Sequence, residues 1–275
     1  FIRVTRLMPV LELDSKNSIF YEYFAPMTNG VTLIFVNALT GSTGTWKGII
    51  TDKIVEDGNG YLIYNFRGQE KSKFDPNLDL DTDLIVSDLV SVFNYINPAR
   101  PVLVGLSIGG LYASLAIDRG LKAEGLVLIN TLRKATQRLT WINQTMVNVA
   151  GYGGTALLMD FNMPMIAGPA LLDKMKPNAL NPSNYKPLDP QSGIFKLMLG
   201  SLSADWNFSW SRLKCPTLVM TGHLDRVFRV SEDIDQLASQ IANVVRVEVP
   251  DSGHLIPLEC PEKFVSEVNI FVEQL

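Results

Sequence analysis

The sequence predicts an α/β protein with a mostly parallel, doubly wound sheet, helices on both faces of the sheet and an inserted helical segment. Short apolar runs, typical of strands buried on both faces, alternate with segments whose apolar residues recur at helical spacing. Such alternation is typical of parallel strands joined by crossover helices. It lapses between Thr131 and about Asp205, where we expect the insertion.

The composition excludes some partners and leaves others open. The chain has 275 residues, enough for one large core or for a core with an inserted domain. Charged residues make up 19% and the formal net charge is −4, so a small-molecule partner is expected and nucleic acid is not. Cys215 and Cys260 are not at metal-ligand spacing and are expected to be reduced. Reduced cysteines and the lack of a signal-peptide pattern after Phe1 favour the cytoplasm, and the oligomeric state stays open.

The first part of the chain predicts a hairpin followed by alternating strands and helices. The hairpin joins Ile2–Glu12 to Ile19–Phe24 across a polar, turn-like stretch. The elements that follow are a buried strand over Val31–Val36, a helix over Trp46–Val55, a second buried strand over Tyr61–Phe66, and a helix capped by Thr82 or Asp83 that extends to Ile96.

The later elements continue the same alternation. A buried strand starts at Val102 and leads into a helix after Ser107. Further strands are predicted over Gly125–Asn130, Pro216–Gly222 and Val244–Val249, with helices over Ser231–Ile241 and Pro261–Leu275. In such sheets ligands bind at the carboxyl ends of the strands, so residues that follow each strand are the candidates for a site.

The strand that starts at Val102 ends in the pattern Gly-x-Ser-x-Gly, typical of a nucleophile elbow. A serine can project from a tight strand-to-helix turn only if the residues two before and two after it are small, as Gly105 and Gly109 are. The helix after the turn directs its first amides and its positive dipole end toward charge that forms beside Ser107. The backbone amide of Ile108 is therefore a candidate oxyanion donor.

A nucleophilic serine needs a base and an acid that orients the base, and the chain has two histidines. His254 follows the last predicted strand and is the expected base. Asp225 precedes it by one helix and one strand, which brings adjacent strand ends together, and is the expected acid. His223 lies only two residues before Asp225, an awkward geometry for pairing, so we interpret it as a loop or surface residue. No carboxylate follows Asn130 directly, which leaves that strand end without an acid.

These motifs and their order resemble the α/β-hydrolase fold superfamily, in its esterase, haloperoxidase and enol-lactonase branch. The order serine, aspartate, histidine is that of this fold. The resemblance covers nearly the whole chain and implies a hydrolase core of residues 1–130 and 206–275 with a helical cap of residues 131–205. It rests on Gly105-Leu106-Ser107-Ile108-Gly109, Gly222-His223-Leu224-Asp225, and Gly253-His254 followed by Leu258-Glu259-Cys260-Pro261-Glu262-Lys263-Phe264.

Two loops depart from the family pattern. Asn37-Ala38 stands where most relatives have His-Gly after the third strand, and Glu70 replaces the second glycine of an Arg-Gly-x-Gly-x-Ser loop. The second oxyanion donor that the resemblance implies is a backbone amide, that of Leu39, so the altered side chains leave it intact. Certain lactonase-like relatives have asparagine at the first position, which slightly favours a lactone or ester substrate.

The expected insertion is apolar and rich in methionine. Between Leu139 and Leu172 its one charged residue is Asp160, and the polar residues and glycines around Asp160 argue against a transmembrane helix. In one interpretation the insertion packs its apolar face on the sheet domain. In a sharper one it is a cap whose apolar side chains also line an adaptable pocket over Ser107. These side chains are Met146, Met159, Met163, Met165, Trp141, Tyr152 and Phe161.

Together these features predict a carboxylesterase-like serine hydrolase that forms an acyl-enzyme and needs no metal or organic cofactor. Ser107 would attack the acyl carbon, His254 would carry its proton and Asp225 would orient His254. Thioesterase, lactonase, carbon–carbon bond hydrolase and acyltransferase activities stay open, as does a ligand receptor with slow hydrolysis. Because no lysine or arginine occurs between Leu139 and Leu172, we expect an uncharged, largely apolar acyl substrate.

Overall fold

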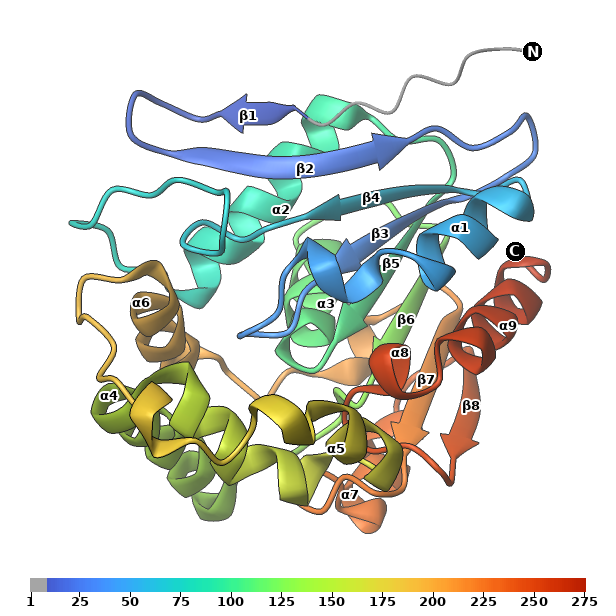
Figure 1. The fold of residues 1–275 in the computed structure, drawn as a ribbon. Coiled ribbons are helices and arrows are strands. Elements are labelled where there is room, and N and C mark those ends of the chain that lie inside the picture. Colours follow the sequence, from blue (N-terminus) through green and yellow to red (C-terminus); the bar gives the residue numbers. More distant parts are fainter. Residues whose placement is uncertain (1–8) are drawn as a thin grey trace.

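The computed structural model describes residues 9–275, and its centre is an eight-stranded sheet (Figure 1). The strands follow the order β1-β2-β4-β3-β5-β6-β7-β8. β1 and β4 both pair with β2 antiparallel, and every pair from β4 across to β8 is parallel. The predicted α/β class with a mostly parallel sheet is confirmed. The strands are β1 (Val10–Glu12), β2 (Ser18–Phe24), β3 (Thr32–Val36), β4 (Gly60–Tyr64), β5 (Pro101–Leu106), β6 (Gly125–Ile129), β7 (Thr217–Gly222) and β8 (Val244–Val249).

Helices cover both faces of the sheet. Successive residues of a strand point to opposite faces, so each strand contributes side chains to two core clusters. Leu33 and Phe35 of β3 belong to one core cluster, with residues of α1 and α9, whereas Ile34 and Val36 belong to the other, with residues of α2 and α3. The helices that flank the sheet are η1 (Thr43–Trp46), α1 (Ile49–Glu56), α2 (Thr82–Ile96), α3 (Ile108–Asp118), α7 (Ser231–Ala238), α8 (Ile256–Glu259) and α9 (Pro261–Val272). Burial on both faces explains why β3 to β7 read as continuous apolar runs.

Several predicted boundaries differ from the structure. Most of the first predicted strand, Ile2–Glu12, lies outside the described residues. The helix expected from Trp46 begins at Ile49, because Gly48 adopts φ 74° and separates it from the short turn η1. The cap of α2 is Asp81, whose carboxylate accepts a hydrogen bond from the amide of Leu84 at 2.9 Å. The structure also ends β4, α7 and α9 earlier than predicted.

Helical structure fills most of the stretch between β6 and β7, and we call residues 131–205 of this stretch the helical insertion. Its longest helix, α4, bends at Gly154, where φ is 72° and a Cβ would lie 2.2 Å from the carbonyl oxygen of Lys186. The bend divides α4 into two arms that lie across the carboxyl ends of the parallel strands (Figure 1). The helices from here to β7 are α4 (Gln137–Ile166), α5 (Pro169–Met175), η2 (Lys176–Asn178), η3 (Pro182–Asn184), α6 (Gly193–Gly200), η4 (Ser201–Ser203) and η5 (Trp210–Arg212). None of the helices within residues 9–275 is long and apolar enough to cross a membrane.

Candidate active site

Ser107 occupies the turn between β5 and α3 with φ 58° and ψ −122°, a conformation that few non-glycine residues adopt. The turn is closely packed on both sides. A Cβ at Gly105 would lie 2.3 Å from the Cα of Gly110, and one at Gly109 would lie 2.3 Å from the carbonyl oxygen of Val36. Only glycine fits at these two positions, so the sequence pattern and the strained serine belong to one local structure.

His254 and Asp225 form a buried, hydrogen-bonded pair. The Nδ1 atom of His254 lies 2.6 Å from Oδ2 of Asp225. The other carboxylate oxygen accepts hydrogen bonds from the backbone amides of Val227 at 3.0 Å and Phe228 at 2.9 Å. Burial raises the pKa of Asp225, but His254, the amide of Phe228 and the nearby charge of Arg133 outweigh burial and hold the pKa below its ordinary value. The aspartate is therefore a charged partner for His254 at neutral pH.

Ser107 and His254 line one cavity of about 230 Å³, together with Leu39 and Ile108. Neither Leu39 nor Ile108 donates its backbone amide to an acceptor among the described residues. The amide of Ile108 has no intrahelical acceptor because it opens α3. Four predicted site residues thus share a cavity, and Asp225 lies behind His254. No hydrogen bond joins Ser107 to His254 in the described part of the chain.

Arg133 is a cavity residue that the sequence analysis did not single out. Its Nη2 donates a hydrogen bond to Oγ of Ser107 at 3.0 Å and another to the carbonyl oxygen of Asn130 at 2.9 Å. Its guanidinium lies over the rings of Trp206 and Phe228, 4.5 Å and 4.3 Å from their centroids. Arg133 precedes the stretch on which the expectation of an uncharged substrate rests. Its position shortly after the central strand β6 is the feature of the sequence that could have indicated a site residue here.

Asn130 connects three loops of the site from the end of β6. Its side-chain nitrogen Nδ2 donates to the carbonyl oxygens of Gly253 at 3.1 Å and His254 at 2.9 Å, and its side-chain oxygen accepts a hydrogen bond from the backbone amide of Gly222 at 2.9 Å. This is the strand end that carries no acid in the sequence. An amide side chain there joins the loop of His254 to the end of β7, just before Asp225.

A network of buried side-chain hydrogen bonds lies behind the candidate oxyanion site, and it includes Asn37, which stands where the resemblance implies a histidine. Asn37 is fully buried, donates to Oε1 of Gln69 at 3.0 Å and accepts the indole N–H of Trp46 at 2.7 Å. The side chain of Gln69 in turn donates to the carbonyl oxygen of Leu39 at 3.1 Å. Glu70 adopts φ 33°, the left-handed region in which the family's glycine is unstrained. The two sequence departures therefore lie in the same supporting loops.

His223 lies apart from the cavity. Its Nε2 is 2.8 Å from Oε2 of Glu248, and both side chains are more than a third exposed. Cys215 and Cys260 form no disulfide within the described residues. Within residues 9–275 no group of three or more His, Cys, Asp or Glu side chains is arranged to hold a metal ion.

The helical insertion lines the cavity with a different set of apolar residues from the one expected. Met146, Met159 and Met163 line it, as the sharper interpretation predicts. Trp141, Tyr152, Phe161 and Met165 do not line it. Tyr152 is 82% exposed, and the other three line a second hollow instead. Trp141 and Tyr152 both belong to the arm of α4 that precedes the bend at Gly154, and their side chains do not line the cavity at Ser107.

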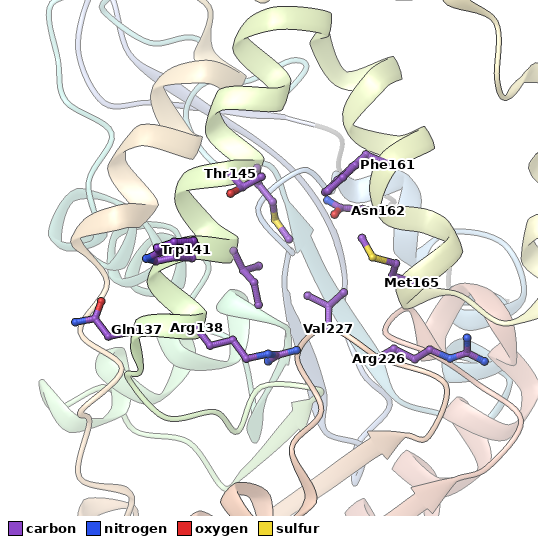
Figure 2. A pocket seen from close by; sticks show the side chains of 11 residues that line it. Gln137, Arg138, Trp141, Thr145, Phe161, Asn162, Met165, Arg226 and Val227 are labelled. Atoms are coloured by element: carbon purple, nitrogen blue, oxygen red, sulfur yellow. The ribbon is translucent and has the colours of Figure 1, made fainter.

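A second hollow of about 580 Å³ lies between the two arms of α4 (Figure 2). Figure 2 shows Trp141 and Thr145 on one arm, Phe161 and Met165 on the other, and Val227 between them. It is larger than the cavity at Ser107 but contains none of the predicted site residues. Both hollows are lined by Met146 and Asn162, which form a shared wall.

The sheet order, the strained serine after β5 and the aspartate and histidine after β7 and β8 are the features of a hydrolase of the α/β type. Residues 33–267 match the alpha/beta hydrolase family, and the protein belongs to that family. The resemblance inferred from the motifs is confirmed at this level.

Individual relatives are distant but match along most of their length. The chain is 22% identical over 249 residues to a 3-oxoadipate enol-lactonase of Acinetobacter baylyi, a match that covers 90% of each chain. A thermophilic esterase from Thermogutta terrifontis has a similar structure, with a TM-score of 0.77, 20% identity and coverage of 99% of this chain and 98% of the esterase. The enol-lactonase from Burkholderia xenovorans LB400 also gives a TM-score of 0.77, with 19% identity and coverage of 96% and 100%. Both structural matches describe a shared fold.

Proposed function

We propose that this protein is a serine hydrolase that cleaves a carboxylic ester or a related acyl bond of a small, largely apolar substrate through an acyl-enzyme. The observation that carries the proposal is a single cavity containing Ser107 at a strained turn and His254 backed by buried Asp225. The esterase and enol-lactonase relatives support acyl chemistry. Localisation in the cytoplasm remains part of this proposal.

In the proposed mechanism Ser107 Oγ attacks the acyl carbon and its proton passes to Nε2 of His254. Asp225 holds the proton of His254 on Nδ1, which leaves Nε2 free to accept, and stabilises the imidazolium that forms. The unpaired amides of Leu39 and Ile108 donate to the oxyanion. His254 then protonates the leaving group, and a water molecule activated by the same imidazole releases the acyl group from the serine.

The helical insertion acts as a cap in this proposal, and residues 1–130 and 206–275 form the core. Methionine side chains are flexible and polarizable, so a methionine-lined roof accommodates acyl groups of different shapes. Each methylene that the cavity buries adds about 0.8 kcal/mol to binding until the cavity is full. A cavity of about 230 Å³ favours short to medium chains.

The experiment compares Ser107→Ala with wild type on p-nitrophenyl esters of rising chain length, lactones and acyl-coenzyme A thioesters. Loss of the nucleophile should lower kcat by about 10⁴-fold or more while the circular dichroism spectrum is unchanged. Ser201→Ala is the matched control, because Ser201 lines the same cavity and donates its hydroxyl to the carbonyl oxygen of Met198. Full activity of Ser107→Ala would refute the proposal, and ligand binding without multiple turnovers would favour a receptor.

A further inference from the structure

Arg133 is a buried cation held in a fixed position. Its side chain is 6% exposed and lies between the rings of Trp206 and Phe228. Stacking on two aromatic faces fixes the plane of a guanidinium and favours its charged form. Burial lowers the pKa of Arg133 to about 10, and the nearby charge of Asp225 acts in the opposite direction. The group is therefore still charged at neutral pH.

The hydrogen bonds of Arg133 leave part of its guanidinium unused. Nε donates to the carbonyl oxygen of Thr131 at 3.3 Å, and Nη2 donates to Asn130 and to Oγ of Ser107. Nη1 has no hydrogen-bond partner within residues 9–275, and no Asp or Glu of that range forms an ion pair with Arg133. Asp225 contributes through its charge but is bonded to His254. A buried charge that no carboxylate contacts directly is costly, so this arrangement suits a site that an anion completes.

The position of Arg133 makes the anion part of the substrate. Its Nη2 lies 3.0 Å from the atom that we propose as nucleophile, so a group bound to the guanidinium is within a few bonds of the scissile carbonyl. The rest of the cavity wall is supplied largely by methionine, leucine and aromatic side chains. Within the cavity lining, Arg133 is the one lysine or arginine among the described residues. The expectation of an uncharged substrate rests on residues 139–172, which contain no lysine or arginine, whereas Arg133 reaches the cavity from the end of β6.

We propose that Arg133 is a specificity-determining residue that binds a carboxylate of the substrate, so that the preferred substrates are small esters or lactones bearing a carboxylate a few bonds from the scissile carbonyl. The proposal rests on the proposed serine hydrolase function. A carboxylate accepts two parallel hydrogen bonds from a guanidinium, which matches the unused Nη1 beside Nη2. When it binds, the carboxylate accepts the Nη2 hydrogen bond that Ser107 Oγ accepts in the free protein, and the serine hydroxyl is released to donate to His254.

The test compares two activated esters of similar length, mono-p-nitrophenyl glutarate, which carries a carboxylate, and p-nitrophenyl hexanoate, which is neutral. The rate with Ser107→Ala is subtracted from each to remove spontaneous hydrolysis. Wild type should prefer the glutarate ester in kcat/KM by about tenfold or more, and Arg133→Met should lower the ratio of kcat/KM for the glutarate ester to kcat/KM for the hexanoate ester by about 20-fold or more. Arg133→Lys should restore part of the preference, since it keeps the charge and loses the planar pair of donors.

Arg138→Met is the matched control, because Arg138 is an exposed arginine of the helical insertion that lines the second hollow, between the arms of α4, and not the cavity at Ser107. It should leave both rates unchanged. Equal kcat/KM for the two esters in wild type, or an equal loss on both in Arg133→Met, would overturn the carboxylate site while Ser107-dependent hydrolysis stands. Failure of wild type to hydrolyse any ester through Ser107 would instead refute the proposed function.

A measurement on wild type alone covers the case in which Arg133→Met does not fold. Free glutarate should inhibit hydrolysis of the hexanoate ester competitively, and neutral glutaramide should inhibit about tenfold more weakly or not at all. Equal inhibition by the two compounds would overturn the proposal, because it would show that the cavity does not distinguish a carboxylate from an amide of the same shape.

Discussion

Asp225 is a carboxylate whose charged form the fold stabilises. Burial raises its pKa, and the charge and hydrogen bond of His254, the Phe228 amide and the charge of Arg133 lower it further than burial raises it. A carboxylate with a lowered folded-state pKa stabilises the fold at every pH above its unfolded-state value. That stabilisation is lost as the pH falls through the lower folded-state pKa.

Asp225→Asn should therefore unfold with a weaker dependence on acid than wild type. The unfolding free energy is measured by urea titration at a series of pH values from neutral to below the ordinary aspartate value of 3.8. The difference between wild type and variant should be constant at neutral pH and shrink as the pH falls below that value. Asp251→Asn, which changes an exposed carboxylate near His254, is the control. Parallel curves for Asp225→Asn and wild type would show that His254 and Arg133 do not hold this charge.

Gln69 supports the loop that carries the candidate oxyanion amide of Leu39. Gln69→Ala removes hydrogen bonds to the carbonyl oxygens of Ala38 and Leu39 and leaves the amide of Asn37 without one acceptor. We expect kcat to fall by about 10- to 100-fold with little change in KM, since the lost positioning matters in the transition state. Steady-state kinetics on a p-nitrophenyl ester measures both constants, with exposed Gln240→Ala as control. An unchanged kcat in a folded Gln69→Ala variant would exclude this role.

The residues of the site divide into those that a local pattern reveals and those that only the fold reveals. Ser107 follows from its flanking glycines, and His254 and Asp225 follow from chain order and from the small number of histidines; their catalytic roles stay predictions. Asn130 and Arg133 make their contacts with loops far away in the sequence, so their position just after a central strand indicates a place in the site but not their partners. Asn130 in particular occupies the strand end that looks vacant when only an acid is sought.

The bend of α4 determines which of its side chains meet the cavity. Gly154 combines a left-handed φ of 72° with a backbone so close to Lys186 that a Cβ would lie 2.2 Å from its carbonyl oxygen. A substitution there meets both the backbone strain and a steric clash. Gly48 provides the comparison, because its φ is 74° and no atom lies within 4 Å of a Cβ built on it.

Gly154→Ala should destabilise the protein by clearly more than Gly48→Ala. The strain alone costs about 1–2 kcal/mol at either position, and the clash at Gly154 adds to it. Urea unfolding gives the two free energies, and ester kinetics shows whether displaced arms of α4 change KM. Equal destabilisation of the two variants would mean that the contact with Lys186 does not hold the bend.

Strands were easier to predict from the sequence than helices. β3 to β7 have continuous apolar runs in the sequence, because both faces of each strand are covered and nearly every residue is buried. Helix boundaries depend on single groups, such as the carboxylate of Asp81 at the start of α2. The path of α4 depends on a contact between Gly154 and Lys186, which the periodicity of either segment does not contain.

In the whole molecule the candidate active site lies at the carboxyl ends of the parallel strands, beneath the largely apolar helical insertion. Strands β5, β7 and β8 supply the turns that carry Ser107, Asp225 and His254, and α4 supplies the methionines above them. Arg133 lies between the two parts, directly after β6. Membership of the alpha/beta hydrolase family explains the arrangement of the strand ends. We propose that the helical insertion and Arg133 together select the substrate.

The central claim, that Ser107 is the nucleophile of an acyl-transfer site, is tested most directly by covalent labelling. Wild type is incubated with a fluorophosphonate, and the labelled peptide is located by mass spectrometry, with His254→Ala and heat-unfolded protein as controls. We expect one label per chain, on Ser107, formed together with loss of esterase activity, and far slower labelling of both controls. Labelling of another residue, or undiminished esterase activity in protein fully labelled on Ser107, would contradict the account.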